Sequence, residues 1–197
     1  MEKCDTIARV CGALAQSNSH TATQILEREY PFKPCKVNKR NYTKFERTQT
    51  FIRDGFICRY SGNRVIFPPV LNLISELLPR VFPTHSNWKM SETHMAYWEL
   101  SAMIDHVVPI ARGGKDDESN WVTSSPLSNS QKANWTIEEM NWELKSPGII
   151  EEWDGMLNWF IEFIDTDKSI LEQKFVAGEI KTWYRAAIRA VKQKRCA

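Results

Sequence analysis

The stretch Ile104-Asp-His-Val-Val-Pro-Ile-Ala-Arg-Gly-Gly-Lys-Asp-Asp-Glu-Ser-Asn-Trp-Val-Thr-Ser-Ser-Pro-Leu-Ser-Asn-Ser-Gln-Lys132 decides the fold of this chain. Residues 103–108 are β-rich, and residues 121–123 predict a second short strand after a polar turn that contains two glycines. A serine at 124 or 125 can cap a helix with Pro126 in its first turn. The stretch therefore predicts a β-hairpin with a helix lying across it.

Four polar side chains on this predicted scaffold have the chemistry of a hydrolytic metal site. Asp105 and His106 leave the first strand in opposite directions, since side chains alternate along a strand. Asn129 and Lys132 are three residues apart on the helix and share a face. A carboxylate and an amide carbonyl are hard oxygen ligands that suit Mg²⁺ or Mn²⁺. A histidine beside them can take a proton from water.

The same residues resemble the motif of the HNH endonuclease family, in which Asp-His is followed by Asn, then by His or Asn, then by Lys. Here Asn120, Asn129 and Lys132 follow His106 at successive intervals of fourteen, nine and three residues. Asn at position 129 is the HNN variant, which is also found in many restriction enzymes. The resemblance covers about residues 50 to 135 and includes residues 53–58 as a lead-in strand.

The resemblance implies a ββα-metal nuclease core that hydrolyses DNA phosphodiester bonds with a divalent cation, Mg²⁺ or Mn²⁺. Asp105 and Asn129 would bind the metal, and His106 would activate water as the general base. Asn120 would hold the loop, and so the imidazole, by hydrogen bonds to backbone. Lys132 would contact phosphate or brace the site.

The sequence departs from the family pattern in two places. Many members carry two Cys-x-x-Cys pairs that hold a structural zinc, whereas this chain has Cys58, Ser61, Ser125 and Ser128 at those positions, so no structural zinc is expected. In addition, 42 residues separate Gly62 from Asp105, more than is usual in the family. We expect an inserted helix and the C-terminal tail to stabilise the core in place of the zinc.

The regions around the motif are expected to be largely helical, which gives an α+β fold with three parts. Residues 1–46 form a helical and basic extension, with two helices over 5–30 capped by Asp5 and Thr21. A basic, extended segment from 35 to 62 leads from this extension into the core. The nuclease core spans 47–135, with an insertion at about 63–100 that contains a helix entered at Pro68. Residues 136–197 form a C-terminal helical subdomain, with one helix from Trp153 to Ile164 and another from Gly178 to Lys194.

Basic residues mark two candidate DNA-binding surfaces. Residues 32–64 carry nine basic side chains against two acidic ones, a local charge of +7 in a chain whose net charge is +2. Helical spacing places several basic side chains on one face of the last helix. The same charges also fit solvated loops and helix faces. The candidates for contacts to DNA are Arg53, Arg59, Arg112, Lys181, Arg185 and Arg189.

Composition narrows the class of protein further. No apolar run approaches the ~20 residues of a membrane span, and the N-terminus has no signal-peptide pattern. The five scattered cysteines do not suggest a disulfide framework. We therefore expect a cytoplasmic DNA endonuclease, in restriction or anti-phage defence, which needs a homodimer for double-strand cleavage. The alternatives are a DNA-binding module that has lost turnover and a ribonuclease or toxin.

Overall fold

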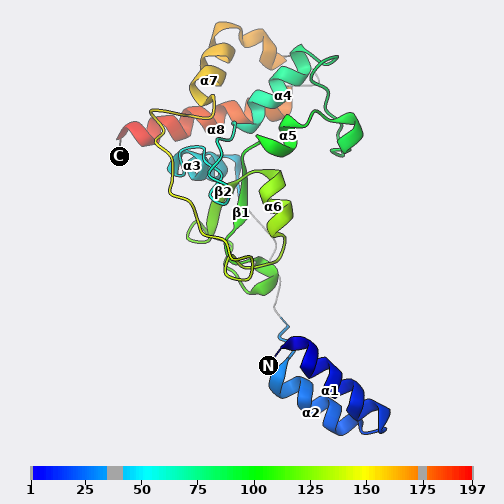
Figure 1. Ribbon diagram of the computed structural model, residues 1–197. Coiled ribbons are helices and arrows are strands. Elements are labelled where there is room, and N and C mark those ends of the chain that lie inside the picture. The colour runs from blue at the N-terminus through cyan, green and yellow to red at the C-terminus, as the bar shows by residue number, and fades with distance from the viewer. Residues whose placement is uncertain (1, 35–41, 173–176, 197) are drawn as a thin grey trace. The chain divides into compact units, whose positions relative to one another are not determined.

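The computed structural model describes residues 2–34, 42–172 and 177–196 (Figure 1). The chain divides into two compact units, Met1–Lys36 and Val37–Ala197. The larger unit contains the residues of the expected nuclease core and those of the expected C-terminal subdomain. In the described parts of the chain, no helix combines the length and the apolarity that crossing a membrane demands.

The smaller unit is a pair of packed helices, α1 (Lys3–Ala15) and α2 (Ser19–Glu29). The two expected helices are present, but both caps differ from the prediction. Glu2 caps α1 in a reciprocal arrangement with Asp5, and Asn18 caps α2 by accepting a hydrogen bond from the Thr21 backbone N–H at 3.0 Å. The predicted capping residues, Asp5 and Thr21, lie three positions after the observed ones. Each occupies the third position of its helix, which is also favourable for it.

The first helix of the larger unit, α3 (Lys44–Arg53), corrects the expectation of an extended segment between residues 35 and 62. Residues 35–41 lie outside the described residues. From Thr43 onward the chain is helical, because Thr43 and Glu46 form a capping box and Phe51 is completely buried against the rest of the unit. Basic side chains between apolar ones suggested an extended segment, but their spacing suits an amphipathic helix.

The segment after α3 is also different from its prediction, since residues 53–58 do not form a strand. Arg53 ends α3, and the chain then turns through Gly55 and Phe56, both with positive φ. A Cβ atom on Gly55 would lie 2.2 Å from the carbonyl oxygen of Gly148, so only glycine fits this close approach. Ile57 makes a single antiparallel bridge to Arg64. The turn rests on tertiary contact with Gly148, which local propensity does not report.

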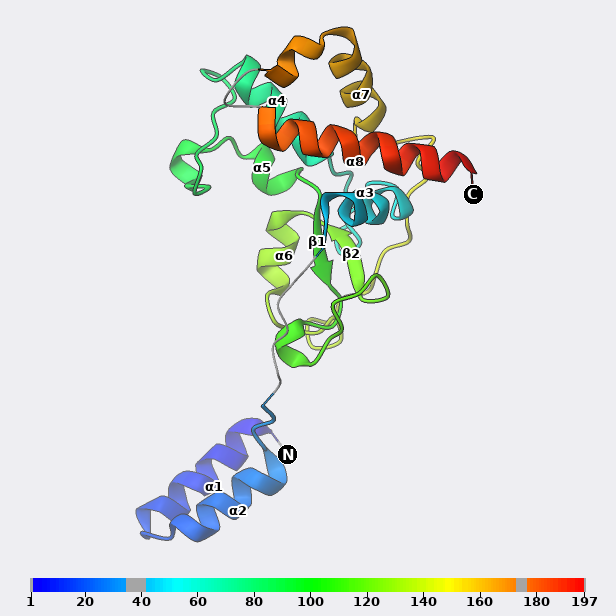
Figure 2. The ribbon, with the colours of Figure 1, turned by 180° about the vertical axis from the view of Figure 1, so that it is seen from behind.

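Three helices enclose the main core of the larger unit. The helix expected in the insertion is α4 (Pro68–Leu77), and the C-terminal helices are α7 (Leu157–Thr166) and α8 (Ala177–Cys196). Phe67 lies between them, with its ring 5.5 Å from Phe160 and 5.3 Å from Trp183 in edge-to-face contacts. Burying each such side chain contributes roughly 1.5–3 kcal/mol. Figures 1 and 2 show α8 running across α3 and beside α4 and α7.

The predicted hairpin and helix are both present. Strands β1 (Met103–His106) and β2 (Trp121–Ser124) pair antiparallel, with Asp105 opposite Val122 and His106 opposite Trp121. They are followed by α6 (Pro126–Lys132), which lies beside β1 in both views (Figures 1 and 2). Short helices complete the unit: α5 (Ala96–Glu99), η1 (Met90–Glu92), η2 (Ile110–Arg112) and η3 (Lys168–Glu172). Helices with one small sheet are consistent with the expected α+β class.

Candidate active site

The hairpin and α6 form the scaffold of the site. Ser125 caps α6 by accepting a hydrogen bond from the backbone N–H of Ser128 at 3.2 Å, and Pro126 occupies the first turn, where no backbone N–H is needed. This cap starts the helix immediately after β2, so α6 follows the hairpin without a linker. The local sequence signals were sufficient here, and this segment folds as predicted.

Asp105 is bound to the scaffold through one of its two oxygens. Its Oδ2 accepts a hydrogen bond from the Tyr60 hydroxyl at 2.7 Å and pairs with the Lys132 ammonium at 3.1 Å. The other oxygen, Oδ1, takes part in neither contact. The Asp105 side chain is 12% exposed, so the carboxylate is held firmly but is still accessible to a ligand.

Lys132 is a buried cation that braces Asp105. Its side chain is fully buried, and its ammonium also donates to the backbone carbonyl of His106 at 2.7 Å. The Tyr60 ring lies 5.7 Å from the ammonium, and burial, reinforced by Asp105, raises the pKa of the Tyr60 hydroxyl, which keeps it a neutral donor. Of the two roles that the resemblance implied for Lys132, bracing fits this geometry, because a buried ammonium does not reach phosphate.

His106 is oriented by Asp116 and Trp121. Its Nε2 lies 2.8 Å from Asp116 Oδ1, and the Trp121 indole N–H lies 3.1 Å from both Nε2 and that carboxylate oxygen. A carboxylate only accepts hydrogen bonds, so the consistent arrangement has Nε2–H and the indole N–H both donating to Asp116. Nδ1 then carries the lone pair of the neutral ring, as a general base requires.

The imidazole is also nearly covered. The His106 side chain is 3% exposed, and the centroid of the Tyr42 ring lies 6.3 Å from that of the imidazole. The Tyr42 ring makes an edge-to-face contact with Trp121 at 5.6 Å as well. Only a small part of the imidazole therefore meets solvent.

Asn120 holds the loop that joins the two strands. Its amide oxygen accepts from the backbone N–H of Val108 at 2.8 Å, and its Nδ2 donates to the carbonyls of Val108 and Lys115, both at 2.8 Å. Gly114 allows this closure, because a Cβ atom there would lie 1.9 Å from the Val108 carbonyl oxygen and 2.8 Å from Asn120 Nδ2. These are backbone hydrogen bonds of the kind that the resemblance implied, and the loop that they close carries Asp116.

Asn129 and Asp105 lie on the same side of β1. Asn129 is half-buried on α6, and its Nδ2 lies 3.5 Å from the sulfur of Met103. Met103 and Asp105 project from one side of β1, because side chains alternate, and α6 contacts that side through Asn129 and Lys132. Asn129 Oδ1 and Asp105 Oδ1 are hard oxygens, the type of ligand that suits a cation that retains water ligands. The described residues contain no group of three or more His, Cys, Asp or Glu side chains arranged to hold a metal.

The residues at the family's zinc positions meet as a hydrogen-bonded cluster. The Cys58 thiol donates to the Ser128 hydroxyl at 3.4 Å, and the Ser125 hydroxyl donates to the same oxygen at 3.3 Å. Burial raises the pKa of the Cys58 thiol, but hydrogen bonds that Ser128, Ser61 and nearby backbone can donate to the thiolate outweigh burial and lower it. One cysteine and three serines thus join the lead-in turn to α6 where a zinc would otherwise do so.

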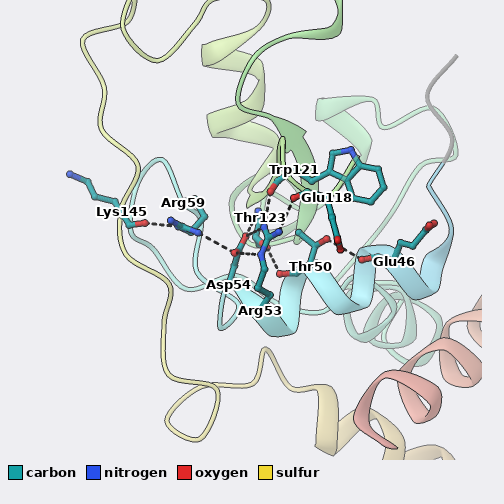
Figure 3. Close-up of polar contacts among 9 residues, drawn as sticks. All are labelled: Glu46, Thr50, Arg53, Asp54, Arg59, Glu118, Trp121, Thr123 and Lys145. Carbon is teal, nitrogen blue, oxygen red and sulfur yellow. Dashed lines mark hydrogen bonds and ion pairs between the residues drawn. The ribbon is translucent and has the colours of Figure 1, made fainter. Parts of the chain in front are cut away.

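Two of the arginines expected to contact DNA are held by a buried aspartate (Figure 3). Asp54 is completely buried, and Arg53 and Arg59 both donate to it. Arg53 also donates to the carbonyls of Glu118 and Trp121, at 3.0 and 2.6 Å, and Arg59 to the carbonyl of Lys145 at 2.5 Å. These guanidinium groups connect α3 to β2 and to the segment at 145.

The other four basic residues expected to contact DNA do not bind Asp54. Arg112 pairs with Glu139 at 2.9 Å. Lys181, Arg185 and Arg189 are exposed on α8, where the Arg189 guanidinium lies 3.9 Å from the centre of the Phe45 ring. No hydrogen bond, ion pair or ring contact among the described residues joins these three side chains to the hairpin.

Sequence reasoning missed Tyr60, Asp116 and Trp121, which hold Asp105 and His106, and Asp54, which holds the arginines. Tyr60 lies outside the motif, and Asp116 is one of two adjacent aspartates in a polar turn. Trp121 resembled a core anchor. The only available signal was the pairing of Trp121 with His106, which follows from the hairpin register once both strands are placed.

Comparison with known families matches part of the chain. Residues 95–134 match the family model of the HNH endonuclease. The matched segment contains Asp105, His106, Asn120, Asn129 and Lys132, and also Asp116 and Trp121. Searches of curated proteins and of solved structures returned no match. The match to an HNH endonuclease model supports a nuclease, and hence hydrolase, activity and implies binding of nucleic acid. HNH nucleases generally use divalent metal ions.

Proposed function

We propose that this protein is a divalent-metal-dependent DNA endonuclease with an HNN active site. The observation that carries the proposal is the pairing of His106 with Asp116 at 2.8 Å, beside an Asp105 carboxylate that keeps one oxygen for a ligand. An imidazole with a fixed Nε2–H and a free Nδ1 is a general base, and a braced carboxylate next to Asn129 offers oxygen ligands to Mg²⁺ or Mn²⁺.

Each residue of the site has a separate role in the proposed hydrolysis. His106 Nδ1 takes a proton from the attacking water, and Asp116 holds the imidazole and stabilises the imidazolium that forms. Asp105 and Asn129 would hold the metal, which supplies charge neutralisation on the phosphate when bound. Lys132 balances the charge of Asp105, and Asn120 keeps the loop closed. The covered His106 becomes accessible when the nucleic acid displaces a covering group such as the Tyr42 ring.

Three finer assignments belong to the same proposal. We infer that the role is in restriction or anti-phage defence, and that double-strand cleavage uses a homodimer, since one such site cuts one strand. Arg112 and the basic face of α8, which includes Lys181, Arg185 and Arg189, are the proposed contacts to the DNA backbone. Arg53 and Arg59 are engaged with Asp54 and contribute to the basic surface only with their unpaired N–H groups.

A second candidate function is a DNA-binding module without turnover, and the 3% exposure of the His106 side chain favours it. Plasmid DNA, single-stranded DNA and RNA incubated with Mg²⁺, and in parallel with a chelator, separate the candidates. The endonuclease proposal expects metal-dependent nicking of plasmid, with 5′-phosphate and 3′-hydroxyl ends. Binding without nicking would favour the second candidate, and cleavage confined to RNA would identify a ribonuclease.

A direct test of the metal site does not depend on turnover. Anomalous scattering from crystals soaked with Mn²⁺ should show a peak between the side chains of Asp105 and Asn129. A peak elsewhere, or a zinc bound at Cys58, would contradict the assignment. Serine hydroxyls are poor zinc ligands compared with thiolates, so the cluster at Cys58 is expected to stay free of metal.

A further inference from the structure

A cavity of about 550 Å³ lies beside Asn129, between α3, α4, α6, the start of α8 and the segment 88–104. Its volume is within the range of roughly 300–1,000 Å³ that is usual for pockets holding small molecules. The lining side chains that indicate which ligand the cavity fits are Arg47, Asn72, Trp88, Trp98 and Asn129. Arg47 belongs to α3, and Asn72, Trp88 and Trp98 belong to the insertion at 63–100, which has no part in the chemistry proposed above.

Arg47 brings to this cavity a cation that has no hydrogen-bonded partner among the described residues. Its guanidinium stacks 4.7 Å from the centre of the Trp183 ring, and its Nε is buried without a hydrogen bond. The acid that also lines the cavity, Glu179, has a 65% exposed side chain and pairs with Lys44 at 3.3 Å. A stacked guanidinium whose N–H groups can still donate fits a phosphate or another oxyanion.

Trp88 brings an aromatic surface to the same cavity. It is 39% exposed, although a large apolar ring is usually covered, and its backbone has φ of 51°, a conformation that non-glycine residues rarely adopt. Trp98 packs edge-to-face on it at 5.5 Å, and Tyr97 does so at 5.7 Å. The ring is therefore supported by its neighbours while remaining open to a ligand.

Two further polar groups at the cavity are available for hydrogen bonds. The Asn72 amide makes no hydrogen bond to any described residue, and the buried Trp98 indole N–H has no partner among them either. An amide carries both donors and an acceptor, as the edge of a nucleobase does. The cavity thus combines an aromatic surface, an amide and a guanidinium within reach of Asn129.

We propose that this cavity binds one unstacked nucleotide of a nucleic-acid strand, with its base against Trp88 and Asn72 and its phosphate toward Arg47. The inference rests on the proposed function, because Asn129 then places the adjoining backbone at the cleavage site. It gives the insertion a role: residues 63–100 provide a base-binding pocket beside the nuclease motif. A fully paired duplex offers no free base face, so an unpaired or extruded base is the form that fits.

The test measures binding by the full-length wild-type protein in the presence of a chelator, so that no strand is cut. Three labelled DNA duplexes are compared by fluorescence anisotropy: one with a single unpaired adenosine, one with an unpaired abasic residue at that position, and one fully paired. Wild type should bind the first at least about tenfold more tightly than the others. Trp88→Ala should weaken binding of that duplex by about 5- to 150-fold, the usual range for loss of a stacking ring, and leave the other two unchanged.

Controls separate the pocket from general effects on the fold and on charge. Trp135→Ala removes a tryptophan that is 51% exposed and does not line the cavity, and it should keep the preference. Asn72→Ala serves if Trp88→Ala does not fold, because the Asn72 amide stabilises no described neighbour by hydrogen bonding, and it should lower the preference several-fold. Circular dichroism checks the fold of each variant.

The remaining outcomes decide against the proposal. Equal wild-type affinity for the three duplexes would overturn it, and so would loss of preference in Trp135→Ala. If free deoxyadenosine monophosphate displaced the bulged duplex as well as unlabelled bulged duplex did, the pocket would serve free nucleotides and the assignment to a strand would be wrong. Because these measurements need neither metal nor cleavage, their failure leaves the proposed function standing, and an inactive protein could still show the preference.

Discussion

Two aspartates in the larger unit, Asp54 and Asp105, are both paired with basic side chains. They differ in how many acceptor positions of the carboxylate remain unoccupied. Asp54 is completely buried and accepts four hydrogen bonds, from the Nε and Nη2 of Arg53, from Arg59 and from the backbone N–H of Thr123. Asp105 accepts both of its bonds through Oδ2 and is 12% exposed. Asp54 has every acceptor position of its carboxylate occupied, whereas Asp105 retains an oxygen for a ligand.

Asp54 is thus a structural carboxylate, whereas Asp105 is suited to chemistry. A carboxylate with all its acceptor positions occupied gains nothing from an added cation, and its loss leaves several donors without partners. A carboxylate that is braced on one oxygen is held in place and can still bind. The same distinction applies to the cations, because Arg53 and Arg59 are committed to Asp54, while Lys181 and Arg185 on α8 make no ion pair among the described residues.

The largest effect is expected at the base beside Asp105. His106→Ala should lower the rate of cleavage by ~10²–10⁴-fold, because the imidazole is the proposed proton acceptor. DNA affinity, measured with a chelator present, should stay near that of wild type. A variant that retained more than about a tenth of the wild-type rate would exclude His106 as the base.

Asp54→Asn should act on stability more than on chemistry. The amide places an N–H₂ group against donors and removes the charge that Arg53 and Arg59 share, which should cost about 3 kcal/mol, the lower end for a broken buried pair, since Arg53 is 44% exposed. Urea unfolding followed by tryptophan fluorescence measures the change. Residual cleavage per folded molecule should remain close to that of wild type.

Asp105→Asn is the matched substitution and should differ from Asp54→Asn in its effect on the metal. Asparagine still offers an oxygen to Tyr60 and Lys132, but it removes the charge that pairs with the fully buried Lys132 ammonium, so some stability should also be lost. Metal affinity, read from the Mg²⁺ dependence of the rate, should fall at least 10- to 100-fold, because the charged ligand is gone. If both aspartate variants lost mainly stability, the distinction drawn between the two sites would be wrong.

Asp116→Asn tests whether the carboxylate orients the base. The amide can turn its N–H₂ group toward Nε2 and favour the other tautomer, with the proton on Nδ1, so kcat should fall roughly 10- to 100-fold with little change in KM. Asp116→Glu, which keeps an acceptor, should recover part of the rate. Equal loss in both variants, together with a lower melting temperature, would indicate a purely structural role.

The smallest effect is expected from the exposed cations. Changing both Lys181 and Arg185 to Gln should flatten the slope of log K against log salt by about two units, because each phosphate that a cation neutralises on duplex DNA contributes about 0.9 to that slope. Changing Arg112 alone should flatten it by about one unit at most. An unchanged slope in the double variant would show that this face of α8 is solvated and does not bind DNA.

The hairpin and helix at 103–132 were predictable because their signals are local. β-rich residues, a Gly-Gly turn and a serine before Pro126 each act within a few residues, and the structure follows them. The segment from 42 to 62 was predicted wrongly, since α3 is stabilised by packing of Phe51 and the turn at Gly55 by contact with Gly148. Those partners are distant in the chain, and no local pattern reports them.

The sequence by itself determined which residues have the chemistry of the site: the spacing of Asp105, His106, Asn120, Asn129 and Lys132 is a property of the chain alone. Only the tertiary structure decided how those groups are held and covered. Asp116 and Trp121 reach His106 through the loop and the strand register, and Tyr60 and Lys132 brace Asp105 from two other elements. Motif spacing follows from geometry within one hairpin and helix, whereas bracing and burial depend on contacts between segments that only folding brings together.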